Sequence, residues 1–415
     1  MSKDTLSFDS NYIYQAVKQF WTPFHLYDEA WILNNLQELF DAFWPIAWFR
    51  EYYAVKTCPN PYIMEILYHA WCGMDCSSLW ELLLCEAVWI RWENIMFTSN
   101  NTQVSEYKKA QELWAIINFD DITHIKYFQK HIWELPELVC FRYNPGPLKS
   151  WNVIIWNPED AKYWLTLEQI YEAYTICKSA WVKRFGLHTM VASNELEVSY
   201  FLETVEILFE LASNIEKKVW IQFEFINLWG WIGIPYKPES HKVDISILSN
   251  WIQNIYKKYF QEKSQPNIVM ECGRYITWPY WYLVAQAIHT KDIYKKYIWV
   301  DACMAHLMRP GMYGAYHHIS VIWKEHLTKN HVYDIVWSLC ENNDKFAIDR
   351  KLPQIDVWDI LVIHDTWAHG FAMGFNYNAK LRSKEILLKQ NGELQLIRRD
   401  ENYKDLFATL NYPNL

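Results

Sequence analysis

The feature that most constrains the fold is a regular alternation of short apolar runs and longer helical segments between about residues 28 and 275. Eight of the runs have the length and the β-branched or aromatic content of strands: Tyr52–Val55, Cys72–Asp75, Asn94–Thr98, Ala115–Phe119, Glu137–Tyr143, Arg184–Met190, Val219–Asn227 and Asn267–Glu271. The segments between them, such as Leu79–Ala87 and Leu196–Leu211, place apolar residues at the i, i+3, i+4 spacing of a helix. Eight successive β-α units predict a (β/α)8 barrel.

The sequence changes in character after Trp278-Pro279. Short strand-like runs separated by turns follow: Tyr282–Ile288, Tyr297–Asp301, Ser320–Trp323, Asp334–Leu339, Ile360–Ile363 and Glu385–Leu388. This pattern predicts an all-β domain, with which the residues before 28 are expected to pair. The predicted fold is therefore α/β plus all-β. A TIM-type barrel would span residues 28–276, and residues 1–27 and 277–415 would form a β-sandwich or β-barrel domain.

The composition excludes several classes of function. The net charge is -9, and basic pairs such as Lys257-Lys258 are isolated, whereas phosphate backbones bind clustered lysine and arginine, so we expect no nucleic-acid partner. No segment reaches the ~20 apolar residues of a membrane helix, and the N-terminus shows no signal peptide. Nine scattered cysteines suit reduced thiols and a cytoplasmic protein. Cys72 and Cys76 have no second ligand pair, so we expect no metal site.

Chemically useful residues follow four of the predicted strands. Lys56 follows the first, His188 lies near the end of the sixth, the loop Trp229–Gly233 follows the seventh, and Glu271–Arg274 ends the eighth. Each alone has an ordinary explanation, as a surface lysine, a structural histidine, a turn or a local ion pair. Because the carboxyl ends of all barrel strands meet at one mouth, the four together predict an active site.

This set of groups suits pyridoxal 5′-phosphate (PLP). The cofactor's aldehyde forms a Schiff base with a lysine amine, here that of Lys56. Its phosphate binds backbone N–H groups of a glycine-containing loop and of a helix start. Its pyridine nitrogen needs a carboxylate to stay protonated, and a flat side chain such as histidine can cover the ring. The sequence therefore predicts PLP as the cofactor.

The sequence resembles the fold-type III PLP-dependent decarboxylases, the alanine racemase-like fold, and within them the diaminopimelate decarboxylase branch. The resemblance runs from Thr22 to Asn378. It is carried by Tyr53-Ala54-Val55-Lys56, Gly73-Met74-Asp75-Cys76-Ser77-Ser78, Glu271-Cys272-Gly273-Arg274, Arg309-Pro310-Gly311-Met312-Tyr313 and Cys340-Glu341-Asn342-Asn343-Asp344. It implies decarboxylation of meso-2,6-diaminopimelate to L-lysine and CO2, the last step of lysine biosynthesis.

The resemblance also implies a role for each residue of the barrel mouth. Lys56 would carry the cofactor, His188 would stack on its ring, and Glu271 would pair with its pyridine nitrogen. An alignment on Ser193 would place Met190 at the stacking position instead. The phosphate would be held by three further residues together with the Tyr377 hydroxyl: Gly230, Gly273 and the amide of Arg274.

Residues of the second domain would complete the site. By the same resemblance, Arg274, Arg309 and Tyr313, with Tyr377 nearby, would bind the distal carboxylate end of the substrate, and Glu341 would bind its distal ammonium. Cys340 would be the acid that protonates the carbon after CO2 leaves. In such enzymes the residues matching Cys340 and Glu341 reach the active site of the other subunit, which implies a homodimer with a small amino-acid substrate.

One feature of the composition departs from this pattern. The chain has 25 Trp and only 11 Gly, and Trp229 and Trp231 stand where relatives carry the glycines of the phosphate loop. Trp80, Trp278 and Trp367 also stand at expected glycine positions, and Trp89, Trp92, Trp114 and Trp181 stand at helix exits that suit glycine.

Indoles at 229 and 231 would block the close approach of the backbone to a phosphate. Since the exchanges are nearly all of one kind and the rest of each motif is intact, we hypothesise that UGA codons meaning glycine in the source organism were translated as tryptophan. Nothing at Trp44 requires glycine.

Two further readings of the function remain. A related enzyme could act on another basic amino acid, such as ornithine, arginine, D-lysine or carboxynorspermidine. A non-catalytic relative could bind a decarboxylase subunit as a decoy. The retention of Lys56 and Cys340 favours an enzyme, and literal tryptophans at 229 and 231 would favour the decoy.

Overall fold

The computed structural model describes residues 6–46, 48–148, 160–230, 232–260, 264–277, 280–366 and 369–412. These residues form two compact units. The barrel unit comprises Leu33–Ile234 and His241–Ile276, and the β unit comprises Met1–Ile32, Pro235–Ser240 and Thr277–Leu415. The domain boundaries expected from the sequence, 28–276 and 1–27 with 277–415, stay a prediction. The compact units differ from them at residues 28–32 and in the short segment 235–240.

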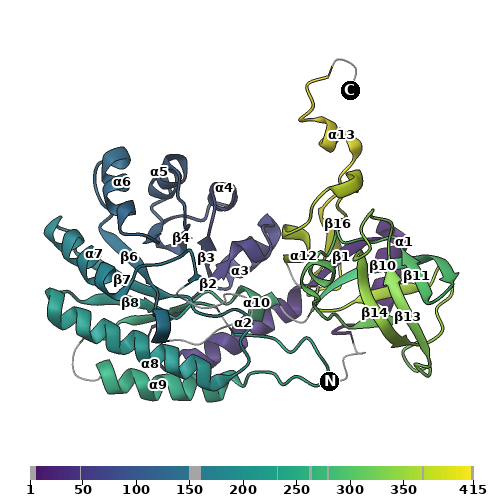
Figure 1. The fold of residues 1–415 in the computed structure, drawn as a ribbon, viewed down its shortest axis with the longest axis horizontal. Coiled ribbons are helices and arrows are strands. Elements are labelled where there is room, and N and C mark those ends of the chain that lie inside the picture. Colours follow the sequence, from purple (N-terminus) through teal and green to yellow (C-terminus); the bar gives the residue numbers. More distant parts are fainter. Residues whose placement is uncertain are drawn as a thin grey trace. The chain divides into compact units, whose positions relative to one another are not determined.

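Eight parallel strands close the barrel unit in sequence order, so the barrel predicted from the alternation is confirmed (Figure 1). They are β2 (Phe49–Ala54), β3 (Gly73–Cys76), β4 (Ile95–Thr98), β5 (Ile116–Phe119), β6 (Leu138–Tyr143), β7 (Arg184–Thr189), β8 (Phe223–Asn227) and β9 (Asn267–Met270). Tyr52, Met96, Cys140, Phe225 and Val269 are among the side chains that fill part of the interior, as is usual for a barrel of this size.

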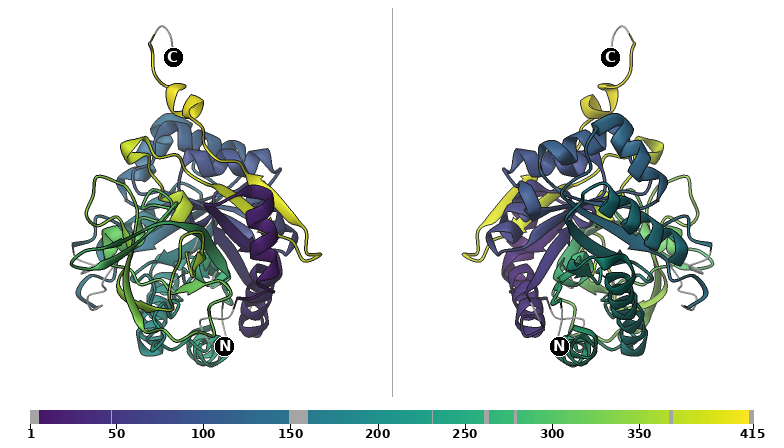
Figure 2. Two further views of the ribbon diagram at one scale, coloured as in Figure 1. Left: turned by 90° about the vertical axis from the view of Figure 1, so that its right-hand side faces the viewer. Right: turned by 90° about the vertical axis from the view of Figure 1, so that its left-hand side faces the viewer.

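Helices cover the outside of the barrel (Figure 2). They are α2 (Glu29–Phe43), α3 (Pro61–His69), α4 (Leu79–Ala87), α5 (Val104–Glu112), α6 (Thr123–Ile132), α7 (Leu167–Ser179), α8 (Val198–Ile215), α9 (Ile245–Phe260) and α10 (Gly273–Thr277). Short 3-10 turns η1 (Val55–Thr57), η2 (Trp92–Asn94) and η3 (Gly146–Leu148) lie in the connections. None of the helices in the described chain combines the length and the apolar character that crossing a bilayer requires.

Two predicted barrel strands are displaced along the chain. The run Val219–Asn227 was predicted as one strand, but Glu216–Trp220 forms a π-helical turn that continues α8, and β8 begins only at Phe223. Apolar Val219 and Ile221 made this end of the helix resemble a strand. Conversely, β2 begins at Phe49, before the predicted start at Tyr52. The prediction began too late because Arg50 and the buried Glu51 interrupt the apolar pattern of the sequence.

The β unit is built on a nine-stranded mixed sheet. Its strands are β1 (Phe24–Asp28), β10 (Trp281–Asp292), β11 (Lys296–Val300), β12 (Ile319–Val321), β13 (His331–Val336), β14 (Lys345–Leu352), β15 (Ile360–Ile363), β16 (Lys384–Leu388) and β17 (Leu394–Arg398). Successive residues Leu283 and Val284 of β10 belong to two different apolar clusters, as expected when a strand is covered on both faces. β1 pairs with β10 and β16, as predicted for the residues before 28.

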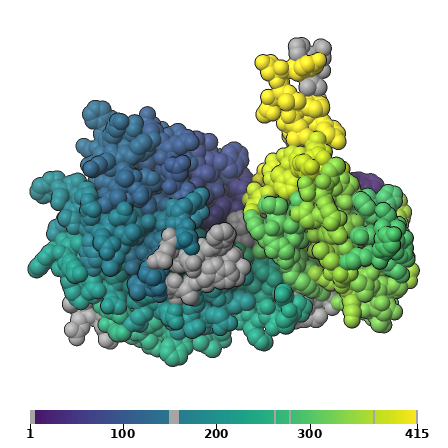
Figure 3. Space-filling view, in the orientation of Figure 1, coloured from purple at the N-terminus to yellow at the C-terminus, as the bar shows by residue number. Residues whose placement is uncertain are grey.

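Short helices complete the β unit: α1 (Asn11–Phe20), α11 (Arg309–Tyr313), α12 (His369–Ala372), the 3-10 turn η6 (Tyr377–Ala379) and α13 (Tyr403–Phe407). The tail that contains α13 projects from the rest of this unit (Figure 3). Strands β14 and β17 were not predicted, because charged residues such as Lys351 and Arg398 break their apolar alternation. The predicted strand Asp334–Leu339 lies instead at His331–Val336.

Tryptophan occupies twelve of the 17 non-glycine positions with positive φ in the described chain. A side chain in the left-handed region costs roughly 1–2 kcal/mol per residue, whereas a whole protein is typically stable by about 5–15 kcal/mol. Twelve tryptophans in this conformation would therefore cost about as much as the entire stability of an ordinary protein. Glycine is the residue that this backbone suits.

Four of these tryptophans end helices in the same way. At Trp71, Trp89, Trp114 and Trp181 the tryptophan follows the C-cap residue, and the next N–H bonds back to a carbonyl five residues earlier, as in Cys72 N–H to Leu67 O. This is the hydrogen-bond pattern of the Schellman motif, whose left-handed position is usually glycine. The expectation of glycine-like helix exits is thus confirmed for Trp89, Trp114 and Trp181, and Trp92 also has positive φ. Trp80 lies inside α4, and Trp231, Trp278 and Trp367 lie outside the described residues.

Two buried histidines of the β unit predict acid sensitivity. Burial lowers the pKa of His25 and of His306 to about 4, and the Nδ1 atom of His306 accepts a hydrogen bond of 2.9 Å from the Cys303 amide. Both rings are therefore neutral in the folded protein. As the pH falls from about 6.5 towards 4, the unfolded chain binds protons that the folded one does not, so stability is lost over this window.

Each histidine should therefore subtract from the free energy of unfolding as the pH falls below 6.5, and His306→Gln should change the slope by roughly 1 kcal/mol per pH unit by removing one such contribution. Denaturant unfolding between pH 7 and 5 measures both slopes. Equal slopes in the wild type and the variant would contradict the assignment.

Candidate functional site

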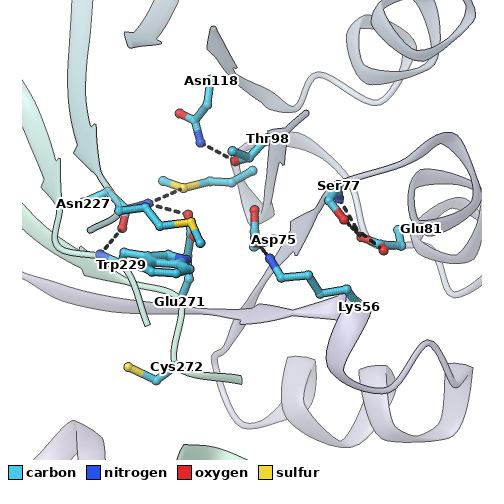
Figure 4. Close-up of polar contacts among 12 residues, drawn as sticks. Lys56, Asp75, Ser77, Glu81, Thr98, Asn118, Asn227, Trp229, Glu271 and Cys272 are labelled. Atoms are coloured by element: carbon cyan, nitrogen blue, oxygen red, sulfur yellow. Dashed lines mark hydrogen bonds and ion pairs between the residues drawn. The ribbon is translucent and has the colours of Figure 1, made fainter. Parts of the chain in front are cut away.

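Lys56 lies in η1, directly after β2, at the carboxyl end of the barrel. Its Nζ is 3.4 Å from Oδ2 of Asp75, which lies in the next strand, β3 (Figure 4). Desolvation lowers the pKa of Lys56, but the charges of Asp75, Glu271 and Glu81 outweigh it, and the net effect raises the pKa. The Lys56 side chain is 41% exposed and that of Asp75 only 1%, so a partly exposed lysine is paired with a buried counter-ion.

Glu271 follows β9 and points into the same mouth. Its carboxylate accepts a 2.6 Å hydrogen bond from Asn227 Nδ2, and its Oε2 lies 3.8 Å from Nε2 of His188. Burial, and then the charge of Asp75, raise the pKa of Glu271 to about 8, although Lys56, Asn227 and Arg142 act in the opposite direction. A cationic partner placed against Glu271 would restore its ionised form.

His188, in β7, is fully buried. Neither of its ring nitrogens has a hydrogen-bond partner among the described residues. Burial lowers its pKa well below the usual value, and Arg142 and Lys56 act in the same direction, so the ring is neutral. An unpaired neutral imidazole at the barrel mouth is a flat surface suited to an aromatic ring.

The loop after β8 approaches the end of β9 very closely. A Cβ on Gly230 would lie 1.7 Å from the carbonyl oxygen of Glu271, so only glycine fits there. A Cβ on Gly273 would similarly lie 2.3 Å from Oγ1 of Thr57. Directly before Gly230, Trp229 has φ 58° and is 7% exposed, and its amide donates to Asn227 Oδ1 at 2.8 Å. Its indole therefore occupies space beside Glu271 (Figure 4).

Two arginines line the same end of the barrel. Arg142 forms a buried ion pair of 2.8 Å with Asp120, and its Nη2 lies 3.2 Å from the sulfur of Met190. Arg274, in α10, reaches Oγ of Ser193 at 3.3 Å. The two alternatives for the ring-stacking position thus differ in environment, since Met190 contacts an arginine whereas the His188 nitrogens are unpaired.

The remaining predicted site residues lie in the β unit. Cys340 is exposed, and its amide donates to Asn378 Oδ1 at 2.7 Å, which joins its segment to η6, where Tyr377 is 46% exposed. Glu341 and Tyr313 are also exposed. The Arg309 guanidinium donates to the Tyr236 hydroxyl at 2.8 Å and lies 4.7 Å from the centre of that ring.

Sequence reasoning assigned no role to three polar residues of the barrel mouth: Asp75, Asn227 and Glu81. Burial raises the pKa of Glu81 to about 7, and its carboxylate accepts hydrogen bonds from the Ser77 amide at 2.6 Å and from the Ser77 hydroxyl. Asn227 is the last residue of β8. The rule that identified Lys56 would have identified Asn227 had it been applied to every strand.

The opposite end of the barrel holds a cavity of about 1190 Å³. Gln37, Trp44, Tyr52, Glu93 and Phe225 are among the side chains that line it, and the described part of its lining contains no lysine, histidine or cysteine. Catalytic groups of such barrels gather at the carboxyl ends of the strands, where Lys56 and Glu271 lie. Among the described residues, no group of three or more metal-ligating side chains is placed to hold a metal ion.

Comparison with known proteins agrees with this geometry. Residues 33–278 match the family described as "Pyridoxal-dependent decarboxylase, pyridoxal binding domain". The chain belongs to this family. It is 36% identical over 92% of its length to Protein TabA of Pseudomonas amygdali pv. tabaci, covering 90% of that protein. It is 30% identical over 96% of its length to the diaminopimelate decarboxylase of Methanothermobacter thermautotrophicus, covering 94% of it.

A crystal structure of diaminopimelate decarboxylase from M. jannaschii in complex with L-lysine superimposes on this decarboxylase with a TM-score of 0.87. The two are 29% identical, and the superposition covers 96% of this chain and 94% of the other. The protein is thus a carboxy-lyase, its cofactor is PLP, and its fold is that of the fold-type III decarboxylases.

The residues of the barrel mouth fit this cofactor with one exception. Lys56 offers an amine on a partly exposed side chain, and Glu271 offers a buried carboxyl whose pKa is raised to about 8. His188 offers a neutral ring whose nitrogens have no hydrogen-bond partner among the described residues. Because Gly230 and Gly273 have no side chain, the backbone can pass close to the Glu271 carbonyl and to Thr57. The exception is Trp229, whose buried indole lies beside Glu271 in the loop that was expected to carry glycines for the phosphate.

Proposed function

We propose that this decarboxylase converts meso-2,6-diaminopimelate to L-lysine and CO2, and so catalyses the last step of lysine biosynthesis. The proposal rests on the likeness, over 96% of the chain, to an enzyme described as diaminopimelate decarboxylase and crystallised with L-lysine. The adjacent Cys340 and Glu341 and the nearby Arg309–Tyr313 helix supply groups for a substrate with both a distal amine and a distal carboxylate.

Lys56 would hold the cofactor covalently through Nζ and release it to the α-amine of the substrate. The Asp75 carboxylate, 3.4 Å away, would stabilise the ammonium that Lys56 becomes when it is free. Lys56 would then take the cofactor back at the end of the turnover. Accessibility of Nζ and a fixed counter-ion are what this exchange requires.

Glu271 would accept a hydrogen bond from the pyridine N–H and hold the proton there. PLP supplies an electron sink for the electron pair that the departing carboxylate leaves behind. Asn227 orients Glu271 through its 2.6 Å hydrogen bond, and neutral His188 would cover the ring without adding positive charge. Gly230, Gly273 and the Arg274 amide, with Tyr377, would hold the phosphate.

Cys340 would give its thiol proton to the carbon that has lost CO2. Arg274, Arg309 and Tyr313 would bind the distal carboxylate, and Glu341 the distal ammonium. We propose that Cys340 and Glu341 act in the active site of a second subunit, so that the enzyme works as a homodimer. Nine free cysteines, eight of them buried, support a cytoplasmic location.

A second candidate is decarboxylation of another basic amino acid, namely ornithine, arginine, D-lysine or carboxynorspermidine. The observation that favours it is the 36% identity to Protein TabA, a relative that does not carry the name of diaminopimelate decarboxylase. A non-catalytic decoy is favoured only by the indole of Trp229 in the phosphate loop.

Release of CO2 from each amino acid by the PLP-loaded enzyme tests the proposal. We expect kcat/KM for meso-diaminopimelate to exceed that for ornithine or D-lysine by at least about 100-fold. These two amino acids lack a distal carboxylate, so the site residues that would bind it are left without a partner. Release of CO2 from a rival but not from meso-diaminopimelate would overturn the proposal. A PLP-loaded protein that releases none from any of them would indicate the decoy.

A further inference from the structure

A buried carboxyl lies outside the barrel wall, behind the mouth. Glu51 is in β2 and has no exposed surface. Its neighbour Tyr52 packs in the barrel interior, and successive side chains of a strand point to opposite faces. Glu51 therefore points outward, towards the layer between the strands and the helices. A carboxyl in this apolar layer needs an explanation, because burying one without partners is costly.

The explanation lies in the strand beside it. β2 pairs with β9 in parallel, with Glu51 opposite Met270, the last residue of β9. Beyond Met270 the chain turns out of the sheet into α10, and ladder hydrogen bonds to β2 end. The Cys272 amide donates to the Glu51 carboxyl instead. The side chain thus replaces the backbone acceptor that the turn has lost.

The turn that Glu51 holds carries two residues of the cofactor site. Glu271 and Gly273 flank Cys272, and the Gly273 amide donates to the Glu271 carbonyl at 2.9 Å. Gly230 packs against the same peptide from the phosphate loop, since a Cβ there would lie 1.7 Å from the Glu271 oxygen. The position of the Glu271 carboxylate and the direction of the Gly273 amide both follow from this turn.

We propose that Glu51 is a positioning residue of the cofactor site, because its carboxyl fixes the Glu271–Gly273 turn from outside the barrel. The proposal shares only the cofactor with the proposed function and does not depend on which amino acid is the substrate. Glu51 itself would touch neither the cofactor nor the substrate.

The surroundings of Glu51 favour its neutral form. Burial raises its pKa well above the usual value, and the charges of Glu271 and Asp75 act in the same direction, against the hydrogen bonds from Cys272. A neutral acid and an amide offer the same oxygen acceptor. Glutamine should therefore replace Glu51 in this role, whereas alanine should not.

The test compares Glu51→Gln and Glu51→Ala with Ser249→Ala. The control removes a different, partly buried hydrogen bond of the barrel unit, from Ser249 to the Ala42 carbonyl, and leaves the Glu271–Gly273 turn untouched. Each variant is made in two backgrounds, the protein with Trp229 and the Trp229→Gly variant. Two quantities are measured on the cofactor-free protein, the Kd for PLP by absorbance titration and the free energy of unfolding.

We expect Glu51→Ala to raise the Kd for PLP by about 10- to 100-fold, the size of effect seen when a group that orients a metal ligand is removed, while Glu51→Gln changes it by less than about threefold. Ser249→Ala should lose stability without losing affinity. An unchanged Kd in Glu51→Ala would overturn the proposal, as would a Glu51→Gln variant as weak as Glu51→Ala. A loss of affinity in Ser249→Ala equal to that in Glu51→Ala would also overturn it, because the effect would then follow from stability alone.

Discussion

Replacing Lys56 by alanine should lower kcat/KM by a factor on the order of 10⁴ or more, because the variant loses the only proposed covalent attachment of the cofactor and the amine that exchanges with the substrate. The same variant should not be labelled when borohydride is added to the PLP-loaded protein, whereas the wild type should carry the cofactor on the peptide that contains Lys56. Peptide mass spectrometry after reduction measures this directly.

The matched control is Lys242→Ala. Lys242 also lies in the barrel unit and pairs with a carboxylate, Glu38, at 3.2 Å, but with both side chains about half exposed. It should keep both activity and labelling. A Lys56→Ala protein that is still labelled at one site would contradict the assignment. If subunits share active sites as proposed, a mixture of Lys56→Ala and Cys340→Ala chains should recover part of the activity that each variant lacks.

The sequence was sufficient to predict the barrel because its strands alternate with amphipathic helices, and both patterns arise from burial. The rule that functional groups collect at the carboxyl ends of barrel strands then led to Lys56, His188 and Glu271, which the structure places around one mouth. The 3.8 Å distance between His188 and Glu271 could not be predicted from the sequence, because the two residues are 83 positions apart and only the closed barrel brings them together.

The residues that sequence reasoning missed share a physical cause. Glu51 looked like a polar break in a strand, because its burial depends on a partner, Cys272, that lies 221 residues away. Asp75 stands in an apolar strand, and its role becomes visible only from its ion pair with Lys56, which follows the neighbouring strand. Polar residues that are buried through non-local contacts leave no periodic signal, whereas apolar residues do.

The second large effect concerns Trp229. We expect the Trp229→Gly variant to bind PLP at least about tenfold more tightly than the protein with tryptophan at this position. The substitution removes an indole from the space beside Glu271 and introduces a residue suited to φ 58°. Protein isolated from the source organism should carry glycine at this position, and codon 229 should be UGA. A UGG codon, or a tryptophan-containing peptide in the mass spectrum, would contradict the hypothesis of a reassigned codon.

Two further substitutions separate the backbone effect from the cofactor effect. Trp181 has φ 66° at a helix end and is 88% exposed, so Trp181→Gly should raise the free energy of unfolding by about 1 kcal/mol and leave PLP affinity unchanged. Trp251 lies within α9 and is 54% exposed, so Trp251→Gly should lower that free energy, by roughly 0.5–1 kcal/mol. Opposite signs at two exposed tryptophans would trace the stability effect to the left-handed backbone rather than to the loss of an indole. If Trp181→Gly were destabilising instead, tryptophan would be tolerated at the helix exits. The positive φ of Trp229 would then no longer be a reason to expect glycine at that position.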